Sequence, residues 1–405
     1  MFTNHPRRSA KTLLGGLAFV AAAFAGPLAS PVHAEPGIGT ISGTVRALDG
    51  SAVQNAHVFA GGSDTYTDGL GHYSILGAAY GPVDVTVQAP CRKDVHRTVT
   101  VDGDETENFV SLIRHDASND VCMDQPGGFW SDATPNLVPL TGDDVITAVD
   151  LPFAFPFYGK PQTKAWVSTN GYLTFSPQTA TDATYHNGPL LDPKTPRNGI
   201  FAFWDDLLID ADADVRTEAS GNGPEATFVI EWRNALVRGT TDRVDVFVLL
   251  ASDGFFAVGH SGPATSDAAR AGSATIGVRN AVTGSGAQSL LRSYDEADPF
   301  STGATWFGVN HKPVAKAGAD KTVASGTTFT LNGLASSDPD QGTSGDGLAY
   351  RWKQVGGPAT AIAHPHQAKT TVAGGPGPKT LTYQLQVIDV FGDTSTDTVK
   401  ITVKA

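Results

Sequence analysis

The densest run of side chains that could carry chemistry in this sequence is acidic and lies at its centre. Asp205 and Asp206 follow an apolar segment, and Asp210, Asp212 and Asp214 come shortly after them. Flexible loops of this kind can hold Ca²⁺, which takes about six to eight oxygen ligands. Two carboxylates could also act as acid and base if one were buried and the other polar. The interpretation we favour is structural: Asp205 and Asp206 accept backbone N–H bonds and the others are solvated.

Nucleophilic and metal-dependent catalysis find weaker support in the sequence. No Gly-x-Ser-x-Gly elbow occurs, and the strand segment Gly259-His-Ser-Gly262 places its His and Ser on opposite faces. The close pair His364-Pro-His366 lacks the helical spacing of zinc ligands. We therefore assign no catalytic or cofactor-binding residue. The alternative is a hydrolase site near Asp205 and Asp206.

Aromatic side chains offer a second route to function, because flat rings stack on sugar rings much as they do on apolar ligands. Trp130 and Tyr172 are our candidate ligand platforms, and Tyr158 and Tyr185 are further candidates. By contrast, three tryptophans lie in apolar strand segments and are predicted to fill the core; they are Trp166, Trp204 and Trp232.

The N-terminus predicts export. Residues 1–34 combine a basic start, a short apolar run and small residues before a cleavage point, which is typical of a signal peptide. The twin-arginine route and the general secretory route both stay open. Removing three of the 28 basic residues leaves 25 against 41 acidic ones, a net charge of −16. Such a chain repels nucleic acid, and no later segment is apolar enough to span a membrane.

The cysteine content is also consistent with an exported protein. Cys91 and Cys122 are the only two, and an exported protein meets an oxidising environment. We predict a disulfide between them, which would join the end of one module to the start of the next. The alternative is two unpaired thiols.

Short alternating strands separated by glycine-rich turns predict an all-β fold with several modules. The segment 37–112 has this pattern, with Asp49-Gly50 as a hairpin turn. Its residues ISGTVRALDGSAVQNAHVFA, TYTDGLGHYSI and GPVDVTVQA resemble the carboxypeptidase regulatory-like domain. That resemblance implies a transthyretin-like sandwich that serves as an accessory module and contributes no catalytic residues.

The middle of the chain, residues 123–308, is predicted to be a larger β-sandwich. Its aromatic residues 153, 155 and 157 alternate along one strand, whose prolines favour an edge position. Asn170-Gly171 predicts a hairpin turn. The segments FPFYG, WVSTNGYLTF, FAFWDDL and FVIEWRN resemble the extracellular nidogen-like β domain of secreted multi-module proteins. The resemblance implies a structural or adhesive role.

Residues 312–405 predict an immunoglobulin-like sandwich with Trp352 in its core. The segments PVAKAGADKTVASGTTFTLNG, YRWKQVGGP and LTYQLQVIDVFGDTSTDTVKITV resemble a polycystic kidney disease (PKD) domain. Because some PKD domains hold calcium near the corresponding loops, the resemblance implies Asp338, Asp340 and Asp389 as calcium ligands. The insertion 341–347 alters that loop, and a turn held by the Asp338 side chain is the alternative.

Together these observations predict a secreted, extracellular, non-catalytic binding or adhesion protein. Its expected partner is an extracellular polysaccharide, a cell-wall polymer or another cell-surface component, with calcium as the only candidate cofactor. The calcium candidates are Asp205, Asp206, Asp210, Asp338, Asp340 and Asp389. The alternatives are a secreted glycoside hydrolase or peptidase, or an accessory part of one, and a structural spacer.

Overall fold

A computed structural model describes residues 37–48, 50–126, 129–179, 184–262, 266–294, 302–340 and 347–405. The predicted signal peptide 1–34, Asp49 of the predicted hairpin turn, and residues 341–346 of the insertion lie outside the described residues. Ile38–Ala405 forms a compact unit of its own.

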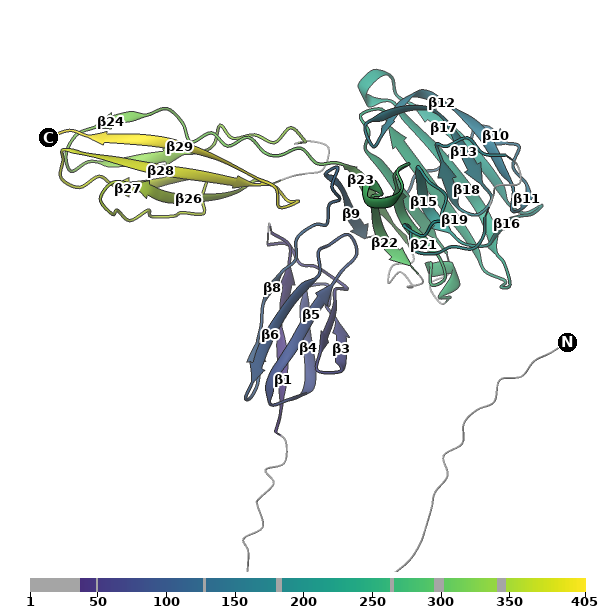
Figure 1. Ribbon diagram of the computed structural model, residues 1–405, viewed down its shortest axis with the longest axis horizontal. Helices are drawn as coiled ribbons and strands as arrows, with labels where there is room; N and C mark the ends of the chain where they lie inside the picture. The colour runs from purple at the N-terminus through teal and green to yellow at the C-terminus, as the bar shows by residue number, and fades with distance from the viewer. Residues whose placement is uncertain are drawn as a thin grey trace, which may run out of the picture. The chain divides into compact units, whose positions relative to one another are not determined.

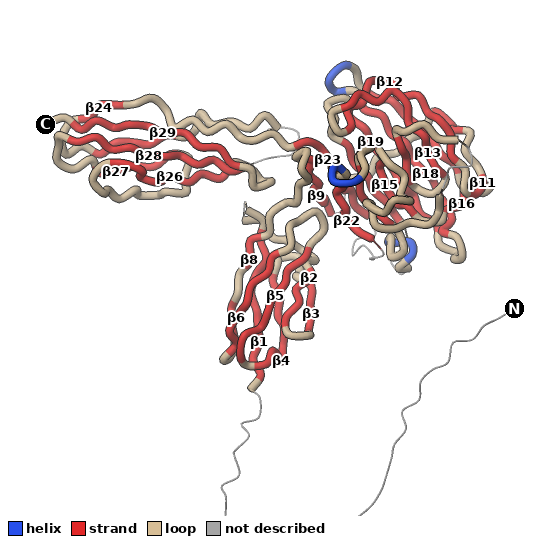
Figure 2. The backbone as a smooth tube through the Cα atoms, viewed as in Figure 1, coloured by secondary structure: helices blue, strands red, loops and turns tan. Residues whose placement is uncertain are grey.

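The prediction of an all-β chain is confirmed (Figures 1 and 2). Within the described ranges, the only helical segments are three short 3-10 turns: η1 (Gly223–Glu225), η2 (Ala268–Arg270) and η3 (Gly284–Gly286). No helix in the described part of the chain is long and apolar enough to cross a membrane.

The first module is a sandwich of two four-stranded sheets. One sheet has the order β4-β1-β7, with β8 also pairing with β1, and the other has the order β3-β2-β5-β6. Alternation along β5 explains how the two sheets pack face to face, because Val83, Val85 and Val87 point into the core while their neighbours point outward. The strands are β1 (Ile38–Arg46), β2 (His57–Ala60), β3 (Ser63–Tyr66), β4 (His72–Ala79), β5 (Gly81–Gln88), β6 (Val95–Val101), β7 (Glu105–Thr106) and β8 (Phe109–Val110).

The central module packs a nine-stranded sheet against a six-stranded one. The larger sheet has the order β10-β17-β18-β19-β20-β23-β9, with β16 pairing with β18 and β11. The smaller sheet has the order β12-β13-β14-β15-β21-β22. The strands are β9 (Asp120–Pro126), β10 (Asn136–Val138), β11 (Gly142–Asp143), β12 (Ile146–Phe157), β13 (Lys160–Ser168), β14 (Tyr172–Thr174), β15 (Gly199–Trp204), β16 (Leu207–Ile209), β17 (Asp214–Ser220), β18 (Thr227–Val237), β19 (Arg243–Ala251), β20 (Phe256–Ser261), β21 (Thr275–Arg279), β22 (Ser289–Tyr294) and β23 (Thr302–Val309).

Aromatic side chains fill the space between these two sheets, as their spacing predicts. Phe155 and Phe157 on β12 are buried, and Phe153 packs partly buried against the same core. Strand β12 is an edge strand, which accommodates its prolines. Trp232 belongs to the same core, whereas Trp204 is buried in a separate, smaller cluster against which Trp166 packs partly buried.

The third module is a sandwich of a four-stranded sheet, β24-β29-β28-β26, and the pair β25-β27. Trp352 is 3% exposed and lies in the core, as predicted. The strands are β24 (Lys321–Val323), β25 (Thr328–Asn332), β26 (Ala349–Gly356), β27 (Lys369–Ala373), β28 (Lys379–Ile388) and β29 (Thr394–Val403).

Local contacts tie the three modules together where the chain passes from one to the next. A disulfide joins Cys91 to Cys122, with their Cα atoms 5.2 Å apart. Close by, Ile113 from the connector, Val121 from β9 and Phe391 from the third module form a small buried cluster. Strands β9 and β23 are paired along their length, so the first and last strands of the central module end beside each other.

Candidate functional site

The hairpin turn between β13 and β14 shapes the acidic region of the central module. Gly171 has φ +68°, and a Cβ atom there would meet the Phe203 carbonyl oxygen at 2.1 Å, so only glycine fits. The neighbouring Asn170 is fully buried. Its Oδ1 accepts the Leu207 N–H (3.1 Å) and its Nδ2 donates to Asp144 Oδ1 (2.8 Å). The predicted Asn-Gly turn therefore also anchors the two acidic segments on either side of it.

Asp205 has a structural role. Its Oδ1 accepts the Asp206 N–H (2.8 Å) and its Oδ2 accepts the Ser273 hydroxyl (2.6 Å). Asp210 is also engaged, because it forms a two-pronged ion pair with the Arg243 guanidinium at 3.0 and 2.6 Å. That pair lowers the pKa of Asp210. Neither Asp205 nor Asp210 joins Asp206 in a common ligand set.

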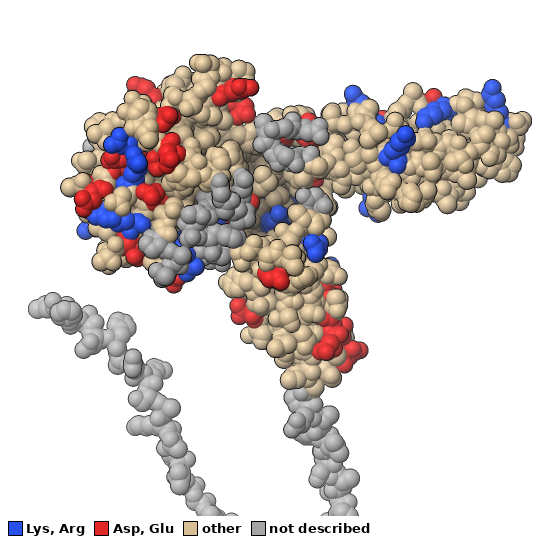
Figure 3. All heavy atoms as spheres, turned by 180° about the vertical axis from the view of Figure 1, so that it is seen from behind, with Lys and Arg blue, Asp and Glu red and all other residues tan. Residues whose placement is uncertain are grey.

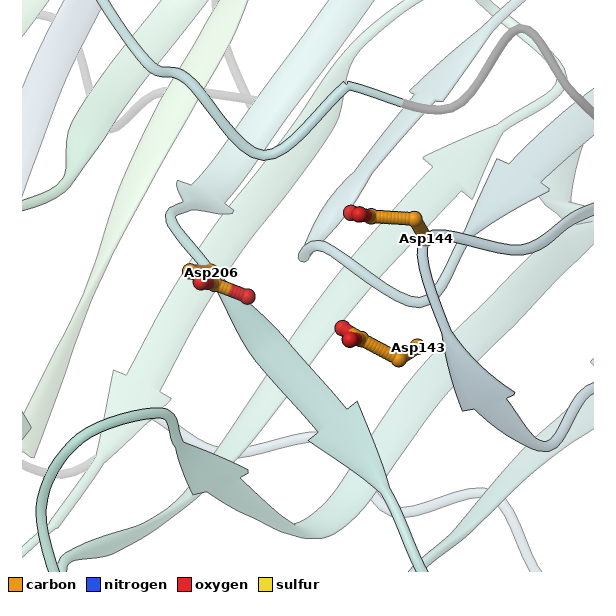
Figure 4. A group of neighbouring side chains, drawn as sticks. All are labelled: Asp143, Asp144 and Asp206. Carbon is orange, nitrogen blue, oxygen red and sulfur yellow. The ribbon is translucent and has the colours of Figure 1, made fainter.

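Asp206 instead meets two residues that the sequence did not suggest. Figure 4 shows the carboxylates of Asp143, Asp144 and Asp206 pointing toward one another. One oxygen from each lies within 4.8 Å of the others, the only such trio found in the described part of the chain. Burial, followed by Asp144 and Asp205, raises the pKa of Asp206. We name this set the central acidic group.

A cation of the protein's own already faces the central acidic group. The Arg238 guanidinium forms an ion pair with Asp143 and lies 3.8 Å from Asp206 Oδ1. All three carboxylates are only partly buried. The guanidinium neutralises part of the charge of the group, while Asp143 Oδ1 and Asp206 Oδ1 are buried without a hydrogen-bond partner.

The carboxylates predicted in the third module are all buried near its junction with the central module, but their oxygens do not form a trio within 4.8 Å of one another. Asp389 is 0% exposed, Asp338 5% and Asp340 6%. Asp338 Oδ1 accepts the Asp340 N–H (2.9 Å), which confirms the predicted side-chain turn. Asp340 binds both the backbone N–H and the ring Nδ1 of His311, at 2.6 and 2.8 Å.

Two residues that the sequence analysis did not predict, Asn310 and Asp393, belong with these carboxylates. Asn310, at the end of β23, donates through Nδ2 to Asp389 Oδ2 (3.0 Å) and to Asp393 Oδ2 (3.1 Å). Asn119, from the connector, also donates to Asp393 Oδ2 (2.9 Å). Asp393 follows Asp389 in the same tight turn, so its spacing was the signal available in the sequence. We name Asn310, Asp338, Asp340, Asp389 and Asp393 the junction cluster.

Oxygen atoms of the junction cluster are buried without a hydrogen-bond partner. They are Asp338 Oδ2 and Asn310 Oδ1. Burial is the main cause that raises the pKa of both Asp338 and Asp389; Asp340 adds to it for Asp338, and Asp393 and Asp338 add to it for Asp389. Carboxylate and amide oxygens gathered in this way are typical Ca²⁺ ligands, and a cation would remove the penalty of burying them.

The predicted ligand platforms have different environments. Tyr172 is 0% exposed, stacks with Phe201 at 5.7 Å and accepts the Thr184 N–H, so its prediction as a ligand platform is wrong. It lies on β14, whose three residues are all buried, with Leu173 in the main core and Tyr172 in a separate cluster. Trp130 is partly buried, contacts Phe247 edge-on at 5.0 Å and donates to Asp132. The hydroxyl of Tyr158 is buried.

Family models match all three modules in the predicted order. The carboxypeptidase regulatory-like domain matches residues 40–112, the NIDO-related family matches residues 123–319, and a PKD domain family matches residues 317–403. These are domain types of extracellular and adhesion proteins. No curated protein matches the chain.

Solved structures resemble the chain only weakly. A nucleoside hydrolase-related hypothetical protein from Saccharophagus degradans, described as associated with carbohydrate metabolism, is 24% identical over 24% of this chain, with a TM-score of 0.21. The match spans about a quarter (26%) of that protein. The PKD domain from the KIAA 1837 protein is 28% identical over 22% of this chain and 84% of its own length, with a TM-score of 0.20. The protocadherin GammaB4 extracellular domain is 10% identical over 93% and 51%, with a TM-score of 0.21.

Proposed function

We propose that this chain is a secreted, non-catalytic binding protein of the adhesion type that recognises an extracellular polysaccharide or cell-wall polymer. The matched modules support this proposal, since they are of accessory and immunoglobulin-like types. The observation that carries it concerns Asp205, which together with Asp206 forms the site of the hydrolase alternative. Both of its carboxylate oxygens are held by Ser273 and the Asp206 backbone. A general acid or base needs an oxygen that can reach a substrate.

A glycan array combined with polysaccharide pull-down tests the binding function. We expect retention on at least one of starch, chitin, cellulose, peptidoglycan or an acidic polysaccharide. Failure across all of them would leave the structural-spacer alternative. Hydrolysis of any of these polymers that is lost in Asp205→Asn/Asp206→Asn would establish the enzyme alternative instead.

We further propose that calcium binds the junction cluster and stiffens the passage from the central to the third module. The ligands come from the end of β23, from the loop before residue 341 and from the turn before β29, so one ion would join all three segments. A ligand at a hundred times its Kd stabilises the folded state by about 2.7 kcal/mol. For a domain of this size that corresponds to a rise in melting temperature of roughly 10 °C or more.

Thermal melting with calcium and with EDTA tests this site. We expect the melting temperature of residues 35–405 to fall on chelation, and calorimetric titration to detect binding. Asp338→Asn/Asp389→Asn should abolish both effects, whereas the matched variant Asp143→Asn/Asp144→Asn in the central acidic group should keep them. Equal behaviour of wild-type protein with calcium and with EDTA would refute a stabilising site.

A further inference from the structure

A cavity of about 720 Å³ lies beside the disulfide, between residues of the first module and residues of the central module. Its volume falls within the roughly 300–1,000 Å³ of small-ligand sites. Cys91 forms part of its lining, so the covalent joint between the two modules borders the cavity. This cavity has no part in the junction cluster or the central acidic group.

The wall from the first module presents a flat aromatic surface. Tyr66 on β3 is directly opposite His57 on β2, and the two rings stack with centroids 4.2 Å apart and an interplanar angle of 10°. Asp64 holds the His57 ring through Nε2 at 2.7 Å. Gln88 lies on the other side of His57 in the same row of paired residues. Tyr66 is 52% exposed, so the row offers a half-exposed ring at one end and a carboxamide at the other, with His57 between them.

The cavity also gathers guanidinium groups. Three guanidinium groups line it, from Arg114, Arg270 and Arg292. Arg114 is paired with Asp94, which also lines the cavity, and Arg270 is paired with Asp267, which does not. The Arg292 guanidinium donates two hydrogen bonds of 2.9 Å to the carboxylate of Asp124, which does not line the cavity. Figure 3 shows acidic side chains gathered on the first module and mixed with basic ones on the central module. A cavity rich in arginine therefore stands out on a chain whose net charge is −13.

We propose that this cavity binds an acidic sugar, a uronate unit of an extracellular polysaccharide. The Tyr66 ring would stack on the sugar ring, the guanidinium groups of Arg114 and Arg270 would bind the carboxylate, and Gln88 would bind hydroxyl groups. A second exposed ring, Tyr294 of the central module, lines the same cavity. This inference rests on the proposed polysaccharide binding and narrows its ligand class to uronates.

Calorimetric titration of residues 35–405 with short oligomers of galacturonate, of alginate and of hyaluronan tests the inference. The neutral comparator is the methyl ester of each oligomer, which keeps the rings and removes the charge. We expect binding of at least one acid oligomer and a loss of about tenfold or more on esterification. Raising the salt concentration should weaken binding of the acid but not of the ester.

Two substitutions locate the site. Arg270→Gln should weaken binding of the acid by about tenfold, and Tyr66→Ala should weaken acid and ester alike by about three- to tenfold. The matched controls are Tyr185→Ala, which removes another tyrosine in ring contact with a histidine (3.9 Å between centroids), and Arg351→Gln on the third module. Both controls should bind like the wild type, and melting curves establish that every variant is folded.

Each remaining outcome decides between the two proposals. Binding of neutral polysaccharides alone, or equal binding of acid and ester, overturns the uronate inference and leaves the proposed function standing. Acid binding that is unchanged in both Arg270→Gln and Tyr66→Ala overturns the assignment to this cavity. Absence of binding to every glycan overturns the polysaccharide function itself.

Discussion

Removal of the Cys91–Cys122 disulfide should loosen the first module and leave the other two nearly unchanged. The bond closes a loop of 31 residues, which contains β6, β7 and β8 of the first sandwich. Loop-closure entropy for that length contributes about 4 kcal/mol to the free energy of unfolding. Both cysteines are buried, at 1% and 0% exposure, so alanine is a better replacement than serine, whose hydroxyl would lack a partner.

Hydrogen exchange is the suitable assay because it reports each module separately. All six tryptophans lie outside residues 37–112, so intrinsic tryptophan fluorescence does not report the first module. In Cys91→Ala/Cys122→Ala, we expect the amides of β5 to exchange about three orders of magnitude faster, which is the rate equivalent of about 4 kcal/mol. The amides of β28 should keep their rates.

Reduction of the wild-type protein provides an independent control. A reductant should raise the β5 exchange rates of the wild type to those of the variant and have no effect on the variant. A change of less than tenfold at β5 would refute the entropy argument. Two alkylatable thiols in the native protein would refute the disulfide itself.

Two further predictions concern pH and packing. Burial, with Asp116 as the second cause, raises the pKa of Asp120 to about 7, so this group stabilises the fold fully below about pH 4 and loses that contribution as pH rises through 7. Asp120→Asn should therefore flatten the decline in melting temperature over that range, and an unchanged pH profile would contradict the assignment. Gly171→Ala should destabilise the central module by about 2–4 kcal/mol, because its Cβ meets the Phe203 carbonyl. Gly159→Ala, which has a similar φ of +69° but open space around it, should cost only about 1 kcal/mol in denaturant unfolding followed by tryptophan fluorescence, and equal losses would refute the steric reasoning.

Alternation of side chains explains why the fold could be predicted from sequence. Along β5 the three valines point inward because successive residues in a strand face opposite sides, and Phe155 and Phe157 follow the same rule on β12. The Asn170-Gly171 turn was predictable for a similar reason, since φ at Gly171 favours glycine. These are local properties, which the order of residues specifies directly.

The junction cluster was only half predictable because its members belong to different modules. Asp338, Asp340 and Asp389 lie in loops of a single sandwich and could be grouped in advance. Asn310 reaches Asp389 across 79 residues, and it does so because β23 ends at that point. The grouping of Asp206 with Asp143 and Asp144 could not be predicted for the same reason. The two segments are far apart in the sequence and meet only at the buried Asn170 turn.

Tyr172 illustrates a different limit. It was a candidate ligand platform because a flat ring can stack on a sugar. The ring is enclosed instead, because Leu190, Phe201 and Trp204 pack against it on that face of the sheet. Sequence pattern shows which face of a strand is apolar, but it does not show whether the opposite face is also covered.

The pairing of β9 with β23 determines how the protein would carry a mechanical load. Asp120 lies opposite Val309, so the chain enters and leaves the central module at the same end of one antiparallel pair. A pull between the first and third modules would thus open that pair one hydrogen bond at a time rather than shear it. The disulfide at Cys122 and the contact of Asn119 with Asn310 lie at the point where the force would enter. The Asn119–Asn310 contact bridges the two chain ends at that point and would have to break before the ladder opens, whereas the disulfide passes the load from the first module to Cys122.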